Sequence, residues 1–281
     1  PKGFGHHVTA DHIISTNEKS LGIDSEASAL VVRDVGCGYM DFYALKRHTT
    51  DATWNAFIDY KGPRDKIGYI YTDGSRELNE ACAHMKVPHG TCTPGRPQGN
   101  TLIESPIRVI LEGIRTIMHH AGVPRPFWPY AGQYFCFTLN VEIKDGESAW
   151  KERHKHGLKK HRGQWKGKQF PFGCLVDFRP CPTTKDKTER GKWDGKAVPG
   201  IFLGIHLNPG ARFSGDAYCI ELADCALMDF RTGRSRGGKH LIRVQRVKLE
   251  TVYRDTSKPY EFPLKKGYDA CFRTLAGVQG E

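Results

Sequence analysis

Three acidic residues stand at points in the sequence from which their carboxylates could act together. Asp11 lies within the alternating stretch HHVTADHIIS (6–15), Asp73 ends the apolar run in GYIYTDGSREL (68–78), and Glu104 follows a Gly- and Pro-rich loop (93–100). Carboxylates at close range raise one another's pKa values unless a cation neutralises them. Mg²⁺ binds such carboxylates, and two ions about 3.5–4 Å apart are suited to in-line attack on a phosphodiester.

Each of these residues also has an ordinary structural interpretation. The chain has 31 Asp and Glu residues, so many other triples fit the same pattern. Asp73 precedes Gly-Ser and suits a turn, where an Asp side chain accepts from its own backbone. Asp11 could cap a neighbouring backbone group. Glu104 is favoured near a helix N-terminus and could pair with Arg108, while Glu112, two turns further on, is a rival third carboxylate.

The first half of the chain predicts a mixed sheet with helices on its faces. Alternation predicts strands over 6–15, 29–35 and 39–46, the last two as a hairpin, and a fourth strand that ends at Asp73. Helical spacing of apolar residues and end signals predict helices over 49–62, 76–85, 101–122 and 125–143. A short strand is expected over 89–94. Asp73 would then lie at the carboxyl end of a strand, where ligand and catalytic groups collect in α/β sheets.

The second half differs from the first in charge. Residues 1–150 carry 15 Lys and Arg against 17 Asp and Glu, whereas residues 151–281 carry 27 against 14. The run 151–168 holds eight Lys and Arg and is typical of a solvated linker. Beyond it, short strand-like segments such as CLVDFRP, GIFLGIHL, AYCIEL, CALMDF and HLIRVQRVKLE predict a small β-rich domain. A strongly basic half joined to a nearly neutral half suggests that a polyanion-binding domain follows a scaffold or catalytic domain in the same chain.

Other features exclude several classes of protein. The nine cysteines form no CxxC pair, which disfavours a zinc finger, and their scattered positions are typical of reduced thiols in an intracellular protein. No apolar run is long enough to cross a membrane, and the start PKGFGHHVTADH lacks the apolar region of a secretory signal. Because the first residue is Pro, we expect the chain to be a piece of a longer one.

Several motifs in order resemble the copia-type retrotransposon integrase. TADHI and YTDGSREL resemble the strands that carry the first two acids, and TPGRPQGNTLIES resembles the segment that carries the third. GVPRPFWPYA resembles the stretch after the catalytic helix. PFGCLVDFRP and GIFLGIHLNPGARFSGDAYCI resemble signatures further on, so the likeness runs from about residue 8 to about residue 250.

The resemblance implies a fold, an activity and a site. It implies an α/β fold in which a ribonuclease H-like mixed five-stranded sheet flanked by helices is followed by a small, mostly-β C-terminal domain. We therefore expect a catalytic core over 1–145, a basic linker over 146–170, a β-rich nucleic-acid-binding domain over 171–255 and a tail over 256–281. Asp11, Asp73 and Glu104 would be the catalytic residues and would hold two Mg²⁺ (or Mn²⁺) ions, with Asn100 supporting them.

By the same resemblance the chain would be a polynucleotidyl transferase and endonuclease that processes DNA 3′ ends and joins them to target DNA. Its partners would be element-end DNA and target DNA, bound by a homo-multimer in the nucleus, with no membrane partner. The expected nucleic-acid contacts are Arg96, Arg108, Lys159, Lys160, Arg162, Lys166, Arg234, Arg236, Lys239 and Arg243, since interleaved Lys and Arg neutralise phosphates without reading sequence.

The sequence also departs from the family pattern. Gly74 stands where the family has Asn, Thr101 stands where it has Gly, and Ser105 with Pro106 follows the third acid where it has Arg. The paired His and Cys residues of the zinc-binding domain are absent. These departures keep open an alternative, in which the chain is an inactive or cleavage-only nucleic-acid-binding remnant of a retroelement polyprotein.

Overall fold

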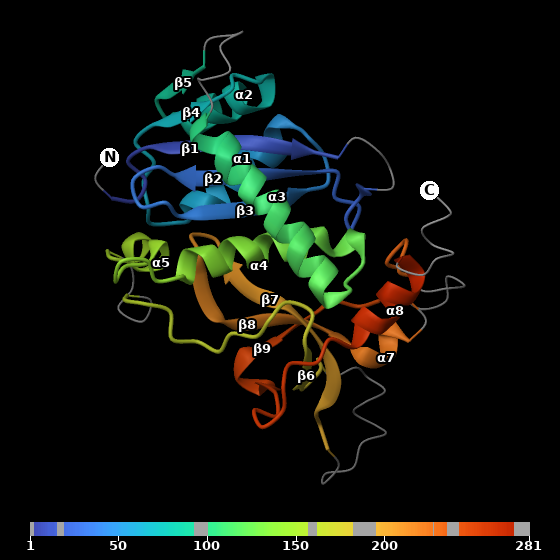
Figure 1. Ribbon diagram of the computed structural model, residues 1–281. Helices are drawn as coiled ribbons and strands as arrows, with labels where there is room; N and C mark the ends of the chain where they lie inside the picture. Colours follow the sequence, from blue (N-terminus) through green and yellow to red (C-terminus); the bar gives the residue numbers. More distant parts are fainter. Residues whose placement is uncertain are drawn as a thin grey trace. The chain divides into compact units, whose positions relative to one another are not determined.

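The chain folds into two compact units, each with its own sheet. The computed structural model describes residues 3–15, 20–92, 101–156, 162–181, 195–226, 228–234 and 242–272 (Figure 1). The first unit comprises residues 1–115, 132–167 and 207–213, and the second comprises 116–131, 168–206 and 214–281. The domain limits expected from the sequence, at residues 145, 170 and 255, stay a prediction.

The first unit is built on a mixed five-stranded sheet. Its strands are β1 (Val8–Ile14), β2 (Ser28–Asp34), β3 (Met40–Leu45), β4 (Ile70–Thr72) and β5 (His89–Thr91). They lie in the order β3-β2-β1-β4-β5, with β1, β2 and β3 antiparallel and β4 and β5 parallel to β1. This arrangement confirms the ribonuclease H-like sheet that the resemblance implied, including the hairpin of its second and third strands.

Helices accompany this sheet, and all but the last of them lie where apolar spacing predicted a helix. They are α1 (Thr50–Lys61), α2 (Arg76–Met85), α3 (Thr101–Ala121), α4 (Trp128–Val141) and α5 (Ala149–Arg153). α1 is capped by Thr49, whose side chain accepts from the Ala52 N–H at 3.3 Å. α4 begins later than expected because Pro124 is extended and residues Arg125–Phe127 form a 3₁₀ turn. None of the described helices is long and apolar enough to cross a membrane.

Buried polar groups fix α4 and α5 to the core of the first unit. Asn140 of α4 accepts from Met40 N at 2.9 Å and donates to Met40 O at 2.6 Å, which ties the helix to the start of β3. Arg153, at the end of α5, has a fully buried side chain. Its guanidinium lies 3.8 Å from the centre of the Phe4 ring and donates to the Tyr60 carbonyl at 2.5 Å. Part of the basic run 151–168 therefore belongs to the core.

The second unit is built on a five-stranded sheet in the order β10-β6-β7-β8-β9. Its strands are β6 (Leu175–Phe178), β7 (Val198–Asn208), β8 (Arg212–Glu221), β9 (Gln245–Lys248) and β10 (Val252–Tyr253), accompanied by α7 (Leu222–Cys225) and α8 (Pro263–Phe272). The small β-rich domain expected from the sequence is thereby confirmed.

The predicted strand over CALMDF (225–230) is wrong. The chain turns at the end of β8 into the short helix α7, and Met228 makes only an isolated bridge. A local hydrogen bond from Cys225 Sγ to the carbonyl of Glu221, at 3.5 Å, satisfies this helical turn and places Cys225 in the core.

All nine cysteines are free. Cys82, Cys136, Cys174, Cys219 and Cys225 are buried, and the other four are partly exposed. Burial raises the pKa of the Cys82 thiol to about 12, so it stays protonated and unreactive at neutral pH. These thiols pack as small apolar side chains.

Candidate active site

Asp11 lies on β1, beside the strand that leads to Asp73. The parallel register of β1 and β4 pairs Val8 with Ile70 and Thr9 with Tyr71. Asp11 follows Thr9 by two residues within β1, and Asp73 follows Tyr71 by two residues, directly after the end of β4, so the register carries both residues towards the same edge of the sheet. Asp11 is half-buried, and its Oδ1 accepts from the His12 N–H at 2.7 Å.

Asp73 is exposed and opens a tight turn at the end of β4. Its Oδ1 accepts from the Ser75 N–H at 3.0 Å, so the turn role expected for an Asp-Gly-Ser sequence is present. Gly74 has φ +81°, and a Cβ there would lie 3.2 Å from Cβ of Thr91 on the next strand. The glycine at this position, where the family has Asn, therefore suits a left-handed turn with little room beside it.

Glu104 lies in the first turn of α3 and is exposed. Two residues later, Pro106 removes the backbone N–H that would have donated to the Leu102 carbonyl. Arg33 of β2 donates to that same carbonyl at 2.8 Å. A side chain from the sheet thus replaces the missing helical hydrogen bond and fixes the turn that carries Glu104.

Electrostatics connect the three carboxylates. Burial is the largest influence on Asp11 and raises its pKa, and the hydrogen bond from His12 opposes it. The charges of Asp73 and Glu104 raise it further, to about 6. Glu104, in the first turn of α3, is thus one of the charges that act on Asp11.

The donor set suits a hard divalent cation. Carboxylate oxygens are the ligands that Mg²⁺ prefers, and a cation would relieve the like-charge repulsion that Asp11 experiences. Within the described residues, no three His, Cys, Asp or Glu side chains already stand at distances that ligate one ion. Binding would therefore require Asp73 and Glu104, both exposed, to adjust towards Asp11.

The side chain of His12 packs against α1. Its Nε2 lies 3.0 Å from Oγ1 of Thr53 on α1, and its ring meets the His48 ring at a centroid distance of 4.3 Å. Burial and then the His48 charge lower the pKa of His12 to about 4, so it is neutral at pH 7. It serves as a packing residue between β1 and α1.

The expected nucleic-acid contacts divide between exposed residues and undescribed ones. Arg108, Arg162, Lys166, Arg234 and Arg243 are exposed in the structure. Arg96, Asn100, Lys159, Lys160, Arg236 and Lys239 lie outside the described residues. The contact role of all of them stays a prediction.

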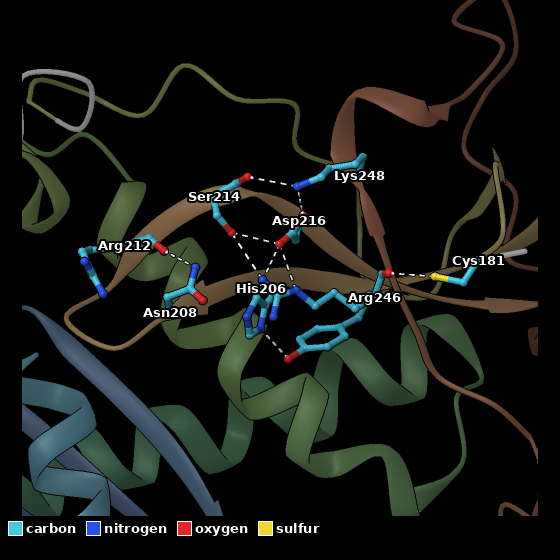
Figure 2. Close-up of polar contacts among 9 residues, drawn as sticks. Cys181, His206, Asn208, Arg212, Ser214, Asp216, Arg246 and Lys248 are labelled. Atoms are coloured by element: carbon cyan, nitrogen blue, oxygen red, sulfur yellow. Dashed lines mark hydrogen bonds and ion pairs between the residues drawn. The ribbon is translucent and has the colours of Figure 1, made fainter.

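A polar network on the second unit was not predicted from the sequence (Figure 2). Asp216 of β8, whose side chain is only 8% exposed, accepts from Ser214 Oγ at 2.9 Å, Arg246 Nε at 2.9 Å and Lys248 Nζ at 2.7 Å. Burial raises the pKa of Asp216, but hydrogen bonds from Lys248, Arg246 and Ser214 outweigh it and lower the pKa to about 2. The signal that could have found it is the alternation of Gln245 to Lys248, which places both cations on one face of β9.

Comparison with known proteins shows that the chain is similar to parts of retroelement polyproteins. No family model matches it. The chain is 29% identical over 201 residues, 69% of its length, to the Retrovirus-related Pol polyprotein from transposon TNT 1-94 of Nicotiana tabacum. It is 29% identical over 128 residues, 43% of its length, to the corresponding polyprotein from transposon RE2 of Arabidopsis thaliana. The matched regions span only 12% and 9% of those polyproteins.

Among solved structures, the chain is similar to a structure described as the HTLV-2 integrase catalytic core domain in complex with magnesium. The match has a TM-score of 0.40 and 20% identity, and it covers 54% of this chain and 99% of that one.

Proposed function

The chain is homologous to a region of copia-type retrotransposon Pol polyproteins, and from this relationship we propose that it acts as the integrase of such an element. In this proposal it trims the 3′ ends of element DNA and joins them to target DNA. It would do so in the nucleus, as a homo-multimer on the two DNA partners.

The observation that carries this proposal is the electrostatic coupling of three acids from distant elements. Asp11 belongs to β1, Asp73 follows β4 and Glu104 opens α3, yet the charges of the latter two raise the pKa of the first. Strongly perturbed carboxylates that gather at one place are typical of functional sites. The order of the surrounding sequence motifs supports the same assignment.

In the proposed mechanism, Asp11, Asp73 and Glu104 would hold two divalent cations. Once bound, these would supply activation of the attacking hydroxyl and stabilisation of the leaving oxygen in an in-line displacement. The chain's own contribution is to fix the three carboxylates: the β1–β4 register fixes Asp11 and Asp73, and the Arg33 hydrogen bond fixes the start of α3. Basic residues of the second half would hold the phosphates of both DNA partners.

The proposal is tested by strand transfer with a labelled oligonucleotide and supercoiled target DNA in Mg²⁺ or Mn²⁺. Glu104→Gln is expected to lose at least about 100-fold in product formation, because removing a group that stabilises the transition-state charge has effects of that size. Glu112→Gln, on the same helix, is the matched control and is expected to keep wild-type activity. Equal activity of both variants and wild type would refute the assignment.

A second candidate function is that of a remnant that cleaves without joining or only binds nucleic acid. Two observations favour it: the sequence departs from the family around Gly74, Thr101 and Ser105, and no three described ligands are pre-set around one ion. The strand-transfer products separate the candidates. Joined strands identify an integrase, fragments alone identify a nuclease, and salt-sensitive binding without either identifies a remnant.

A further inference from the structure

Two exposed tyrosines distinguish the surface of the second unit. Of the large apolar and aromatic side chains described in this unit, Tyr253 and Tyr260 are the exposed ones, at 61% and 45%. Tyr253 ends β10 and Tyr260 lies in the segment that follows. Water-exposed aromatic rings are unfavourable unless they serve a contact, and such residues are enriched where proteins bind partners.

Each ring carries a cation on one face. Lys168 Nζ lies 4.1 Å from the centre of the Tyr253 ring, and the Arg254 guanidinium carbon lies 4.0 Å from the centre of the Tyr260 ring. Both cations are held in place by the backbone: Lys168 donates to the Val252 carbonyl at 2.9 Å and Arg254 donates to the Lys258 carbonyl at 2.7 Å. Both rings belong to one short segment of the chain, residues 252–260.

Two further cations add positive charge to the same sheet, on β9, which precedes β10 in the sequence and forms the opposite edge of the sheet. Arg246 and Lys248 of β9 are 47% and 57% exposed, and both are oriented by the buried carboxylate of Asp216 (Figure 2). One carboxylate that faces two cations leaves a net positive charge. The hydrogen bonds that Arg246 and Lys248 donate to Asp216 restrict the motion of both cations. Over residues 242–260 there are five Lys and Arg against two Asp and Glu.

This combination fits an unpaired nucleic-acid strand. Exposed aromatic rings stack on bases, and adjacent cations contact the phosphates between them. Bases in a duplex are already stacked and paired, so they cannot use such rings, whereas cations alone bind duplex and single strand alike. An acidic protein surface would be attracted to the cations by charge alone. A nucleic-acid strand offers phosphates to the cations and also bases that stack on the tyrosine rings.

We propose that Tyr253 and Tyr260 stack on unpaired nucleotides while Lys168 and Arg254, which lie against the two rings, hold the adjoining phosphates. This site goes beyond the proposed integrase activity and requires neither a metal ion nor the carboxylates of the first unit. It would take a single-stranded segment or an unpaired end of DNA.

The test is the anisotropy of fluorescent oligothymidylate and of a duplex of the same length, each titrated with the full chain in EDTA. Tyr253→Ala and Tyr260→Ala are each expected to weaken single-strand binding by about 5–100-fold, the range for loss of one stacked base, and to change duplex binding less than twofold. Tyr253→Phe keeps the ring and is expected to bind as wild type. Ile143→Ala, which removes a side chain of similar exposure (59%) from the first unit, is the control and is expected to bind as wild type.

Thermal unfolding of each variant checks that the second unit remains folded. If the alanine variants bind oligothymidylate as tightly as wild type, the proposal is overturned. It is equally overturned if they lose single strand and duplex to the same extent, since that result would identify a purely electrostatic surface or an altered fold. Because the titration contains no metal, failure here leaves the proposed strand-transfer activity standing, and the reverse also holds.

Discussion

Asp11 and Asp216 are strand carboxylates in the two units, and their surroundings move their pKa values in opposite directions. Burial and the charges of Asp73 and Glu104 raise the pKa of Asp11 to about 6. At Asp216, hydrogen bonds from Lys248, Arg246 and Ser214 outweigh burial and lower the pKa to about 2. The first carboxylate lies among like charges, which only a bound cation would balance, whereas the chain itself supplies the cations for the second.

Under the proposed function, the two carboxylates serve different purposes. The like-charge repulsion at Asp11 would be relieved by a bound cation and would cost stability when that cation is absent, which is a common exchange of stability for function. A carboxylate with its own Arg and Lys stabilises the native state and positions those cations instead. The predictions below test whether this contrast is real.

The largest expected effect is on catalysis. Asp11→Asn removes one of the three proposed metal ligands, so strand transfer is expected to fall by at least about 100-fold. Product formation from a labelled oligonucleotide in Mg²⁺ measures it. Asp51→Asn, which changes an exposed carboxylate in the first turn of α1, is the matched control and is expected to retain activity. If the Asp11→Asn variant joined strands at the wild-type rate, Asp11 would not be a catalytic metal ligand.

The next effect is on the stability of the second unit. The lowered pKa of Asp216 stabilises the native state at pH values above its unfolded pKa of about 3.8, and this contribution is lost as the pH falls towards 2. At face value the shift corresponds to about 2.4 kcal/mol, and because both cations are half-exposed we expect about 1–2 kcal/mol.

Urea unfolding of Asp216→Asn and wild type measures this contribution. The variant is expected to be less stable at pH 7, and the difference is expected to shrink between pH 4 and pH 2. A difference that is absent at pH 7, or that does not shrink in acid, would show that the network contributes nothing to folding.

A smaller effect of opposite sign is expected at Asp11. Because its folded pKa lies above the unfolded value, the native state binds a proton more readily and wild-type stability falls as the pH rises from about 4 to about 6. In EDTA at pH 7, Asp11→Asn is therefore expected to be more stable than wild type by about 1 kcal/mol, after discounting for solvent screening. Denaturant unfolding at pH 5 and pH 7 measures this gain, which should be smaller at pH 5. If the variant is less stable than wild type at pH 7, ionised Asp11 does not destabilise the native state and the raised pKa is contradicted.

The smallest effect concerns the helix that carries Glu104. Arg33→Met removes the hydrogen bond to the Leu102 carbonyl that replaces the one lost at Pro106, at an expected cost of about 0.5–1 kcal/mol. Amide hydrogen exchange over residues 103–110 should become faster. Arg108→Met, on the exposed side of the same helix, is the control and should leave that exchange unchanged. Unaltered exchange in Arg33→Met would mean that the first turn of α3 does not depend on the sheet.

Local pattern in the sequence predicted most elements of both units. Alternation gave β1 and the β2–β3 hairpin, and α2 was predicted at its observed limits, because these segments carry their own turn and cap signals. CALMDF was misjudged because its apolar residues fit a strand or a short buried helical turn equally well.

What the sequence could not provide is contact between distant residues. The Arg33–Leu102 hydrogen bond joins residues 69 positions apart, and the Asp216 network joins residues up to 32 positions apart. No local pattern in the sequence specifies such contacts. The convergence of Asp11, Asp73 and Glu104 was inferred from resemblance, and the β1–β4 register now gives it a physical basis for the first two. Arg153 was grouped with a solvated basic run because nothing in its sequence neighbourhood indicates that Phe4 and Tyr60 enclose it.

The most direct measurement is the binding of Mn²⁺ to the full chain, followed by electron paramagnetic resonance of the free ion. Wild type and Glu112→Gln are expected to bind Mn²⁺ saturably and with the same affinity, while Asp11→Asn, Asp73→Asn and Glu104→Gln each lose most of that binding. If the five proteins take up the ion equally, or none takes it up, the three acids do not form a metal site and the proposed chemistry is contradicted.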